Sequence, residues 1–164
     1  MIASDEARAN LADRELVITR AFDAPRGLVF KVWAQPEHLV RWWAPRDFTT
    51  PSLKMDVRPG GTYRTCIRSP EGKEHWMQGV YREVVEPERL AMTFAWEHER
   101  GQPGHETLVT VTFADEGGKT RLTFRQAVFE SAADRDSHRK GWSSFLDRLE
   151  RYLAAGAGDG IAPD

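Results

Sequence analysis

The sequence predicts an α+β fold in which one antiparallel sheet packs against a long C-terminal helix. From Leu53 to Val128, apolar and polar residues alternate and turn residues recur at regular intervals, which is typical of consecutive antiparallel strands. Residues 131–155 then carry apolar side chains at the i, i+3, i+4, i+7 spacing of an amphipathic helix. Alternation leaves one sheet face apolar, and the long helix is the simplest cover for that face.

Length and composition indicate one folded domain. The chain has 164 residues, of which 40% are hydrophobic, and this suffices for a substantial core. A formal net charge of −2 argues against a nucleic-acid partner. Cys66 is the single cysteine, so no intramolecular disulfide can form, and the N-terminus lacks the apolar run of a signal peptide or membrane span. We expect a soluble cytoplasmic protein, either a monomer or a homodimer.

The first part of the chain predicts one strand followed by two short helices. Residues 1–13 have no sustained apolar face and predict a disordered tail. Residues 15–23 alternate and predict a strand. Pro25 opens one short helix and Pro36 opens a second, because proline is tolerated in the first helical turn. The second helix is expected to run past two tryptophans and to end at Pro45.

Six further strands are expected after a loop at residues 46–51. Turns rich in Gly, Pro, Asp and Glu separate most of them. The connection at residues 97–106 is longer, polar and contains two glycines and a proline, so it predicts a loop. The expected strands cover residues 53–57, 63–68, 75–85, 90–96, 107–114 and 120–128.

The long helix has signals at both ends. Ser131 and Asp134 resemble a capping box, and Gly156 suits the left-handed conformation that ends many helices. Gly141 lies inside the helix, where glycine costs about 1 kcal/mol relative to alanine, so we expect close contact with the sheet there. Residues 156–164 predict a second disordered tail, which leaves 14–155 as the folded domain.

Several short motifs occur in order between about Arg14 and Ala154. They are Arg20-x-Phe22-x-Ala24-Pro25, Val29-Phe30-x-x-Trp33, Pro36-x-x-Leu39-x-x-Trp42-Trp43-x-Pro45, Asp56-x-Arg58-x-Gly60-Gly61, Gly79-x-Tyr81-x-Glu83-Val84 and Gly141-Trp142. Together they resemble the bacterial Hsp90 ATPase activator homologue (AHSA-like) family of the START-like, or SRPBCC, superfamily.

This resemblance implies the helix-grip fold, a curved antiparallel sheet of six to seven strands around the C-terminal helix. It also implies a hydrophobic ligand cavity between sheet and helix, since members of the superfamily bind lipids, polyketides and other apolar small molecules. The eukaryotic co-chaperone that names the family carries a further N-terminal domain, which this chain is too short to hold. A chaperone partner is therefore not the first expectation.

No local motif indicates a metal, a nucleotide cofactor or an activated nucleophile. The histidines form no HxxxH or HExxH pair, and Cys66 has no second thiol, so we expect no metal. The sequence contains no P-loop, GxGxxG or GxSxG motif, so we expect no cofactor. Glutamates and histidines gather at residues 97–106, but a solvated hairpin tip explains that composition better than chemistry does.

The positive signal is a set of aromatic and polar side chains on faces predicted to point toward the long helix. Burying an amide without a partner costs roughly 1–3 kcal/mol, so inward amides indicate a partly wet cavity rather than a plain core. A phase error of one residue, or bonds to backbone at the sheet ends, would instead explain Gln78 and Gln126. The candidate ligand-binding residues are Trp42, Trp43, Tyr63, Trp76, Gln78, Phe94, Trp96, Phe124, Gln126, His138, Trp142 and Phe145.

Three functions are compatible with this pattern. We favour non-enzymatic binding of an apolar small molecule, aromatic or lipid-like. The second is a cyclase- or aromatase-like enzyme that uses His138, Gln126 or Arg20 as proton donor or orienting group. The third is a chaperone-related interaction module, ranked last because charged residues and threonine dominate the outer sheet face. If Gln126 and His138 serve a ligand, leucine at either position should leave stability unchanged or improve it.

Overall fold

The computed structural model describes residues 14–156. Apart from Gly156, the predicted tails lie outside the described residues, and the division of the chain into one domain and two tails remains a prediction. The helices are α2 (Arg26–Ala34), α3 (Pro36–Leu39) and α4 (Ala132–Ala154), with a short 3₁₀ helix, η1 (Glu99–Gly101). The strands are β1 (Leu16–Phe22), β2 (Thr49–Met55), β3 (Thr62–Arg68), β4 (Glu74–Val85), β5 (Arg89–Trp96), β6 (Thr107–Glu116) and β7 (Lys119–Ala127).

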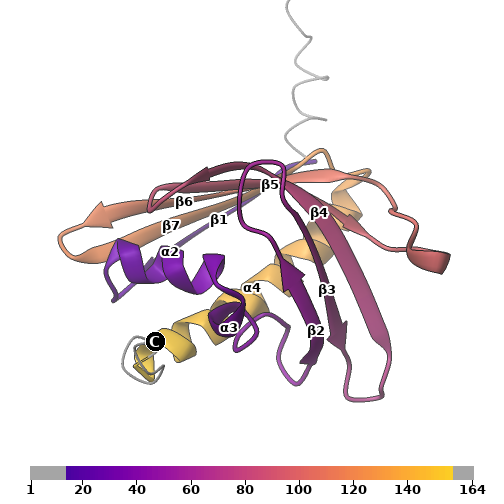
Figure 1. The fold of residues 1–164 in the computed structure, drawn as a ribbon, viewed down its shortest axis with the longest axis horizontal. Coiled ribbons are helices and arrows are strands. Elements are labelled where there is room, and N and C mark those ends of the chain that lie inside the picture. Colours follow the sequence, from indigo (N-terminus) through magenta and orange to yellow (C-terminus); the bar gives the residue numbers. More distant parts are fainter. Residues whose placement is uncertain (1–13, 157–164) are drawn as a thin grey trace, which may run out of the picture.

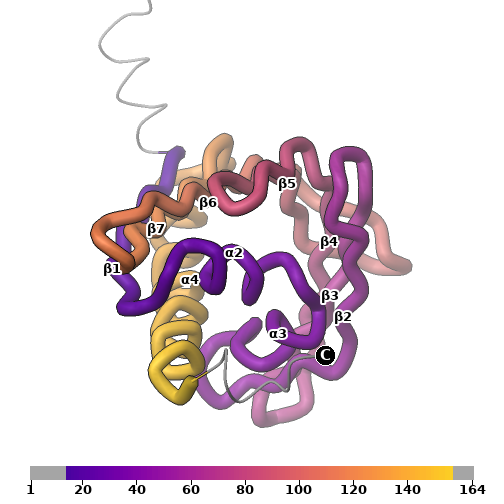
Figure 2. The backbone as a smooth tube through the Cα atoms, turned by 60° about the vertical axis from the view of Figure 1, so that its left-hand side comes forward, coloured from indigo at the N-terminus to yellow at the C-terminus, as the bar shows by residue number. Residues whose placement is uncertain are grey.

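The described strands form one seven-stranded antiparallel sheet in the order β1-β7-β6-β5-β4-β3-β2. Phe124 of β7 pairs with Ile18 of β1 on one side and with Val111 of β6 on the other. The sheet curves into an arch whose two ends are β1 and β2, and the helices lie on its concave side (Figures 1 and 2). This is the predicted α+β helix-grip architecture.

Both ends of α4 form as predicted. The hydroxyl of Ser131 accepts a 3.1 Å hydrogen bond from the backbone amide of Asp134. Gly156 follows the helix with a φ of +82°, a conformation that glycine adopts without strain. The buried face of α4 is made by Trp142, Phe145, Leu146 and Leu149.

Two boundaries differ from the prediction. The α3 helix ends at Leu39, and the chain continues as a turn in which the amides of Trp42 and Trp43 both bond to the Leu39 carbonyl. Strand β2 begins at Thr49 and includes Pro51, which had been assigned to a loop. Proline is tolerated there because β2 is an edge strand of the sheet and its register shifts after Thr49.

An aromatic cluster fills the middle of the arch. The Trp33 and Trp42 rings meet edge to face at 4.8 Å, and Trp43 meets Phe145 of α4 at 5.0 Å. Such ring pairs add about 0.5–1.5 kcal/mol beyond their buried area. The helices α2 and α3 are thereby tied to α4 and to the concave sheet face.

The strand crossing at Gly79 of β4 leaves no room for a side chain. A Cβ atom there would lie 1.9 Å from the carbonyl oxygen of Thr93 and 2.5 Å from the ring of Tyr63. The Tyr63 hydroxyl donates a 2.6 Å hydrogen bond to the same Thr93 oxygen. Burial of this phenol raises its pKa well above the ordinary value, so it remains a donor. Glycine therefore allows β3, β4 and β5 to approach closely here.

None of the helices in residues 14–156 combines the length and apolar character needed to cross a bilayer.

Candidate functional site

A cavity of about 320 Å³ lies between the concave sheet face at β3–β5 and the first half of α4. The loop between α3 and β2 supplies its remaining wall. The lining residues are Pro45, Phe48, Ile67, His75, Met77, Phe94, Trp96, Ser137, His138, Gly141, Trp142 and Phe145.

Most of the cavity wall is aromatic or aliphatic. Phe94, Trp142 and Phe145 are almost completely buried and form its inner part. The Phe94 ring lies 5.6 Å from the Trp142 ring, and Trp142 lies 4.8 Å from Phe145. Pro45 and Phe48 are only partly buried and stand nearer to solvent. An apolar ring entering between them would therefore meet other rings throughout.

The cavity carries no formal charge among its described lining residues. Asp, Glu, Lys and Arg are all missing from that set, and its polar side chains are His75, Ser137 and His138. Ser137 is exposed on α4. An ionised ligand would find no opposite charge in this lining, so the site suits an uncharged molecule.

His138 is held in one orientation by bonds to both ring nitrogens. Its Nδ1 lies 2.7 Å from the backbone oxygen of Asp134, which can only accept, so Nδ1 donates. Its Nε2 accepts a 2.8 Å hydrogen bond from the indole N–H of Trp96. His138 therefore forms a fixed part of the wall, and neither nitrogen is left for a substrate.

His75 of β4 is different. Its side chain makes no hydrogen bond to any residue in the described part of the chain, although it is half-buried. Its ring lies between two aromatic neighbours in the lining, 6.4 Å from Phe48 and 6.3 Å from Trp96. His75 thus presents a polar group with unused donor and acceptor capacity to the cavity.

Gly141 of α4 faces the cavity and not the sheet. A Cβ atom built on Gly141 would meet nothing within 4 Å. The expectation that this glycine marks close contact between α4 and the sheet is therefore wrong, because the space beside it is open. The missing side chain adds to the cavity volume.

The predicted site residues separate into three groups. Phe94, Trp96, His138, Trp142 and Phe145 line the cavity. A second group lies in the core, where each indole or phenol bonds to the protein. Trp42 donates to the Val32 oxygen, Trp43 to the Thr65 hydroxyl and Tyr63 to the Thr93 oxygen, while Phe124 packs on Trp142 at 4.6 Å.

Gln126 belongs to the same core group. It is fully buried, its Nε2 donates a 2.8 Å bond to the Thr107 hydroxyl, and its Oε1 accepts a 2.7 Å bond from Trp142 Nε1. The expectation that this amide is present for a ligand is not supported by its position, since it does not line the cavity.

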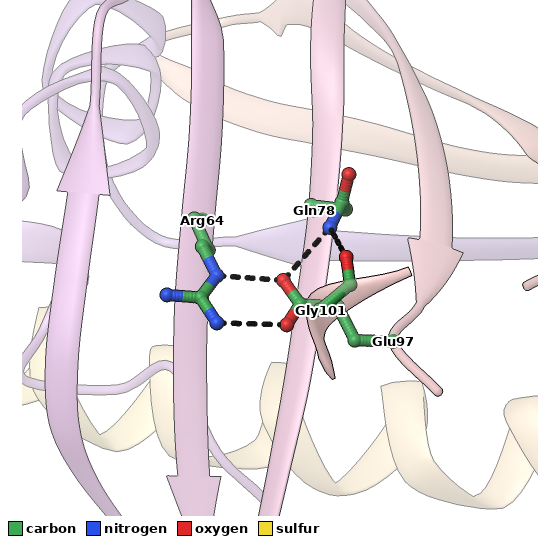
Figure 3. A network of polar contacts seen from close by, with 4 residues as sticks. All are labelled: Arg64, Gln78, Glu97 and Gly101. Carbon is green, nitrogen blue, oxygen red and sulfur yellow. Dashed lines mark hydrogen bonds and ion pairs between the residues drawn. The ribbon is translucent and has the colours of Figure 1, made fainter. Parts of the chain in front are cut away.

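The third group, Trp76 and Gln78, lies on the outer sheet face, so the prediction that they point toward α4 is wrong. The Arg64 guanidinium stacks over the Trp76 ring at 4.0 Å. Gln78 donates to a Glu97 carboxylate oxygen at 2.8 Å and to the Gly101 carbonyl at 3.1 Å (Figure 3). The phase of β4 is shifted by one residue, which reverses every side chain.

The outer network fastens the loop after β5 to the sheet. Arg64 binds both carboxylate oxygens of Glu97, at 2.7 and 2.8 Å, and the Glu97 side chain is only 3% exposed (Figure 3). Hydrogen bonds from Arg64 hold the pKa of the Glu97 carboxyl below its ordinary value, although burial acts in the opposite direction. This network is structural and is distant from the cavity lining.

With this geometry established, comparison with known proteins assigns the family. The sequence pattern described as activator of Hsp90 ATPase homologue 1-like protein matches residues 23–154. The chain belongs to this AHSA1-like family. The resemblance inferred from the sequence motifs is thereby confirmed. A comparison with curated proteins gives no match.

Solved structures agree with the AHSA1-like fold. A protein from Arthrobacter aurescens superposes with a TM-score of 0.81 at 21% identity, covering 90% of each chain. The AHSA1 protein from Silicibacter pomeroyi gives 0.79 at 22% identity, covering 86% of this chain and 98% of its own. A protein from Rhizobium leguminosarum gives 0.72 at 28% identity, covering 86% and 94%.

The cavity residues of this AHSA1-like domain that the sequence analysis missed come mostly from positions without a periodic signal. Pro45 and Phe48 lie in a loop, and His75 and Met77 lie in the strand whose phase was misassigned. Ile67 could have been found, because it continues the alternation of Tyr63 and Thr65 in β3.

Groups suited to other chemistry do not converge in the AHSA1-like domain. Among residues 14–156 no cluster of three or more His, Cys, Asp or Glu side chains is arranged to hold a metal ion. Arg20 bonds to Asp147 at 2.7 Å and to the Ser143 oxygen at 3.2 Å. His138 and Gln126 are equally engaged, so the three groups considered for proton donation are already paired within the protein.

Proposed function

We propose that this AHSA1-like protein binds an uncharged, apolar small molecule, aromatic or lipid-like, in the cavity between β3–β5 and α4. The observation that carries the proposal is a cavity of about 320 Å³ walled by aromatic rings and free of charged side chains among its described lining residues. Ligand pockets of about 300–1,000 Å³ commonly have this composition.

The size and chemistry of the cavity favour a compact ligand. At roughly 30 Å³ per water molecule, the cavity has room for about ten non-hydrogen atoms. Water in this space would find few hydrogen-bond partners, because the Phe, Trp and Met side chains offer almost none. Displacing that water with an apolar molecule is favourable for the same reason that core burial is.

Binding without catalysis fits the polar groups better than an enzymatic role. General acid–base catalysis needs a group that can exchange a proton with the substrate, commonly with a second group to orient or relay it. His138 is bonded at both nitrogens, and His75 has no carboxylate or second free base beside it in the described lining. The cavity therefore lacks the paired groups that such a mechanism uses.

A calorimetric titration with naphthalene tests the proposal. Wild-type protein should bind it, and Gly141→Leu should bind at least about tenfold more weakly because the leucine occupies the cavity. The matched control is Gly27→Leu, since Gly27 also lies in a helix with nothing within 4 Å of its Cβ but is outside the cavity. Equal affinity in all three proteins, or no heat in any, would contradict the proposed function.

A further inference from the structure

We infer that the ligand is an aromatic molecule bearing a hydroxyl group, and that His75 recognises this hydroxyl by a hydrogen bond. The inference rests on the proposed function and specifies the ligand chemistry of the same cavity.

The first step is an account of the hydrogen-bonding groups at the cavity wall. The indole N–H of Trp96 is taken by His138, and that of Trp142 is taken by Gln126. His138 has both nitrogens bonded. Of the half-buried polar side chains in the described lining, His75 is the one whose nitrogens have no described partner.

The second step is the position of His75. It pairs with Ile67 across the β3–β4 ladder, and both side chains line the cavity. The ring stands beside Phe48 and Trp96 at 6.4 and 6.3 Å. A planar ligand packed on these aromatic neighbours would bring its edge substituent within reach of the imidazole.

The third step is the choice of substituent. A neutral imidazole has one donor and one acceptor nitrogen, and a hydroxyl can serve either. A carboxylate would need a compensating cation, and no Arg or Lys occurs in the described lining. Leaving a charge uncompensated away from water is costly, whereas a hydroxyl brings no charge. An aromatic hydroxyl compound therefore matches both the apolar wall and the imidazole.

The expected discrimination is moderate because His75 is only half-buried. A neutral hydrogen bond contributes a roughly three- to tenfold gain in affinity after exchange with water. Much larger ratios arise where loss of the hydroxyl strands a fully buried polar group, which is not the situation of His75.

The test compares naphthalene, naphthol and naphthoate by calorimetry at about pH 8, above the range in which histidine ordinarily titrates. Wild-type protein should bind naphthol roughly three- to tenfold more tightly than naphthalene, and naphthoate most weakly. His75→Leu should keep naphthalene binding and lose the preference for naphthol. His75→Gln should retain part of that preference, because the amide can still form a hydrogen bond.

Ser137→Ala is the control for the exposed hydroxyl on α4, and it should leave the preference intact. The inference is overturned if His75→Leu still prefers naphthol, if Ser137→Ala abolishes the preference, or if naphthoate binds most tightly to the wild type. Equal binding of naphthalene and naphthol by the wild type would also overturn it while the proposed function stands. Absence of binding of all three probes would contradict the proposed function itself.

Discussion

The indole N–H of Trp142 donates a 2.7 Å hydrogen bond to the side-chain oxygen of Gln126. The amide nitrogen of Gln126 in turn donates to the Thr107 hydroxyl at 2.8 Å, and that hydroxyl donates to the Phe94 carbonyl at 3.0 Å. This chain connects α4 to β7, β6 and β5. It fixes Trp142, which is both a core residue and a wall of the cavity.

Replacing Gln126 should therefore destabilise the protein. Gln126→Leu leaves the buried Trp142 N–H and the Thr107 hydroxyl without this partner, and we expect the free energy of unfolding to fall by about 1–3 kcal/mol. Urea denaturation followed by circular dichroism measures this. Gln102→Leu, at an exposed loop position, is the control and should change stability by less than about 0.5 kcal/mol. A Gln126→Leu protein as stable as the wild type would restore the earlier expectation that this amide serves a ligand.

Two glycines should respond oppositely to the same substitution. Gly141→Ala should raise the free energy of unfolding by about 0.5–1 kcal/mol, because the methyl group enters open space and improves helix propensity. Gly79→Ala should lower it by about 1–3 kcal/mol, because the new Cβ would lie 1.9 Å from the Thr93 carbonyl oxygen. Thermal unfolding of both variants is sufficient. The same sign of change for both would show that the space at one of the two positions is misassigned.

The ion pair between Arg64 and Glu97 should make stability depend on pH. The carboxyl has a lowered folded-state pKa, so its contribution is present above the unfolded pKa of about 4.3 and is lost as the pH falls through the lower folded value. Wild-type protein should exceed Glu97→Gln in stability at neutral pH, and the difference should shrink below about pH 4.3. Because the Arg64 side chain is half-exposed, added salt should also reduce the difference.

Urea unfolding of both proteins over a range of pH measures this difference. The control is Glu99→Gln, which alters an exposed carboxylate in the same loop and should show no comparable narrowing. A Glu97→Gln difference that is the same in acid and at neutral pH would mean that the pair does not stabilise the fold.

Much of the fold was predictable because its signals are local. Alternation in β5, β6 and β7 and the helical spacing of α4 each arise from residues close together in the chain. The caps at Ser131 and Gly156 are likewise set by a few neighbouring residues. Less predictable was β2, where Pro51 looked like a strand breaker until its edge position was known.

The cavity was harder to predict because it depends on how distant segments pack. Strand β4 has an aromatic side chain in either phase, with His75 on one face and Trp76 on the other, so composition alone did not set the phase. Gly141 could signal either contact or empty space, and only the neighbouring atoms distinguish the two. Gln126 was correctly placed on the inner face, but its partners come from β6 and α4.

The central claim is that an apolar ligand enters the space between β3–β5 and α4, and nuclear Overhauser contacts from bound naphthalene test it most directly. The account predicts contacts to the methyl group of Met77 and to the ring protons of Trp96, both of which line the cavity. It predicts none to Met92, which borders a gap of only about 20 Å³ in the packed core. Contacts to Met92 without Met77, or to the outer face at Trp76, would contradict the account.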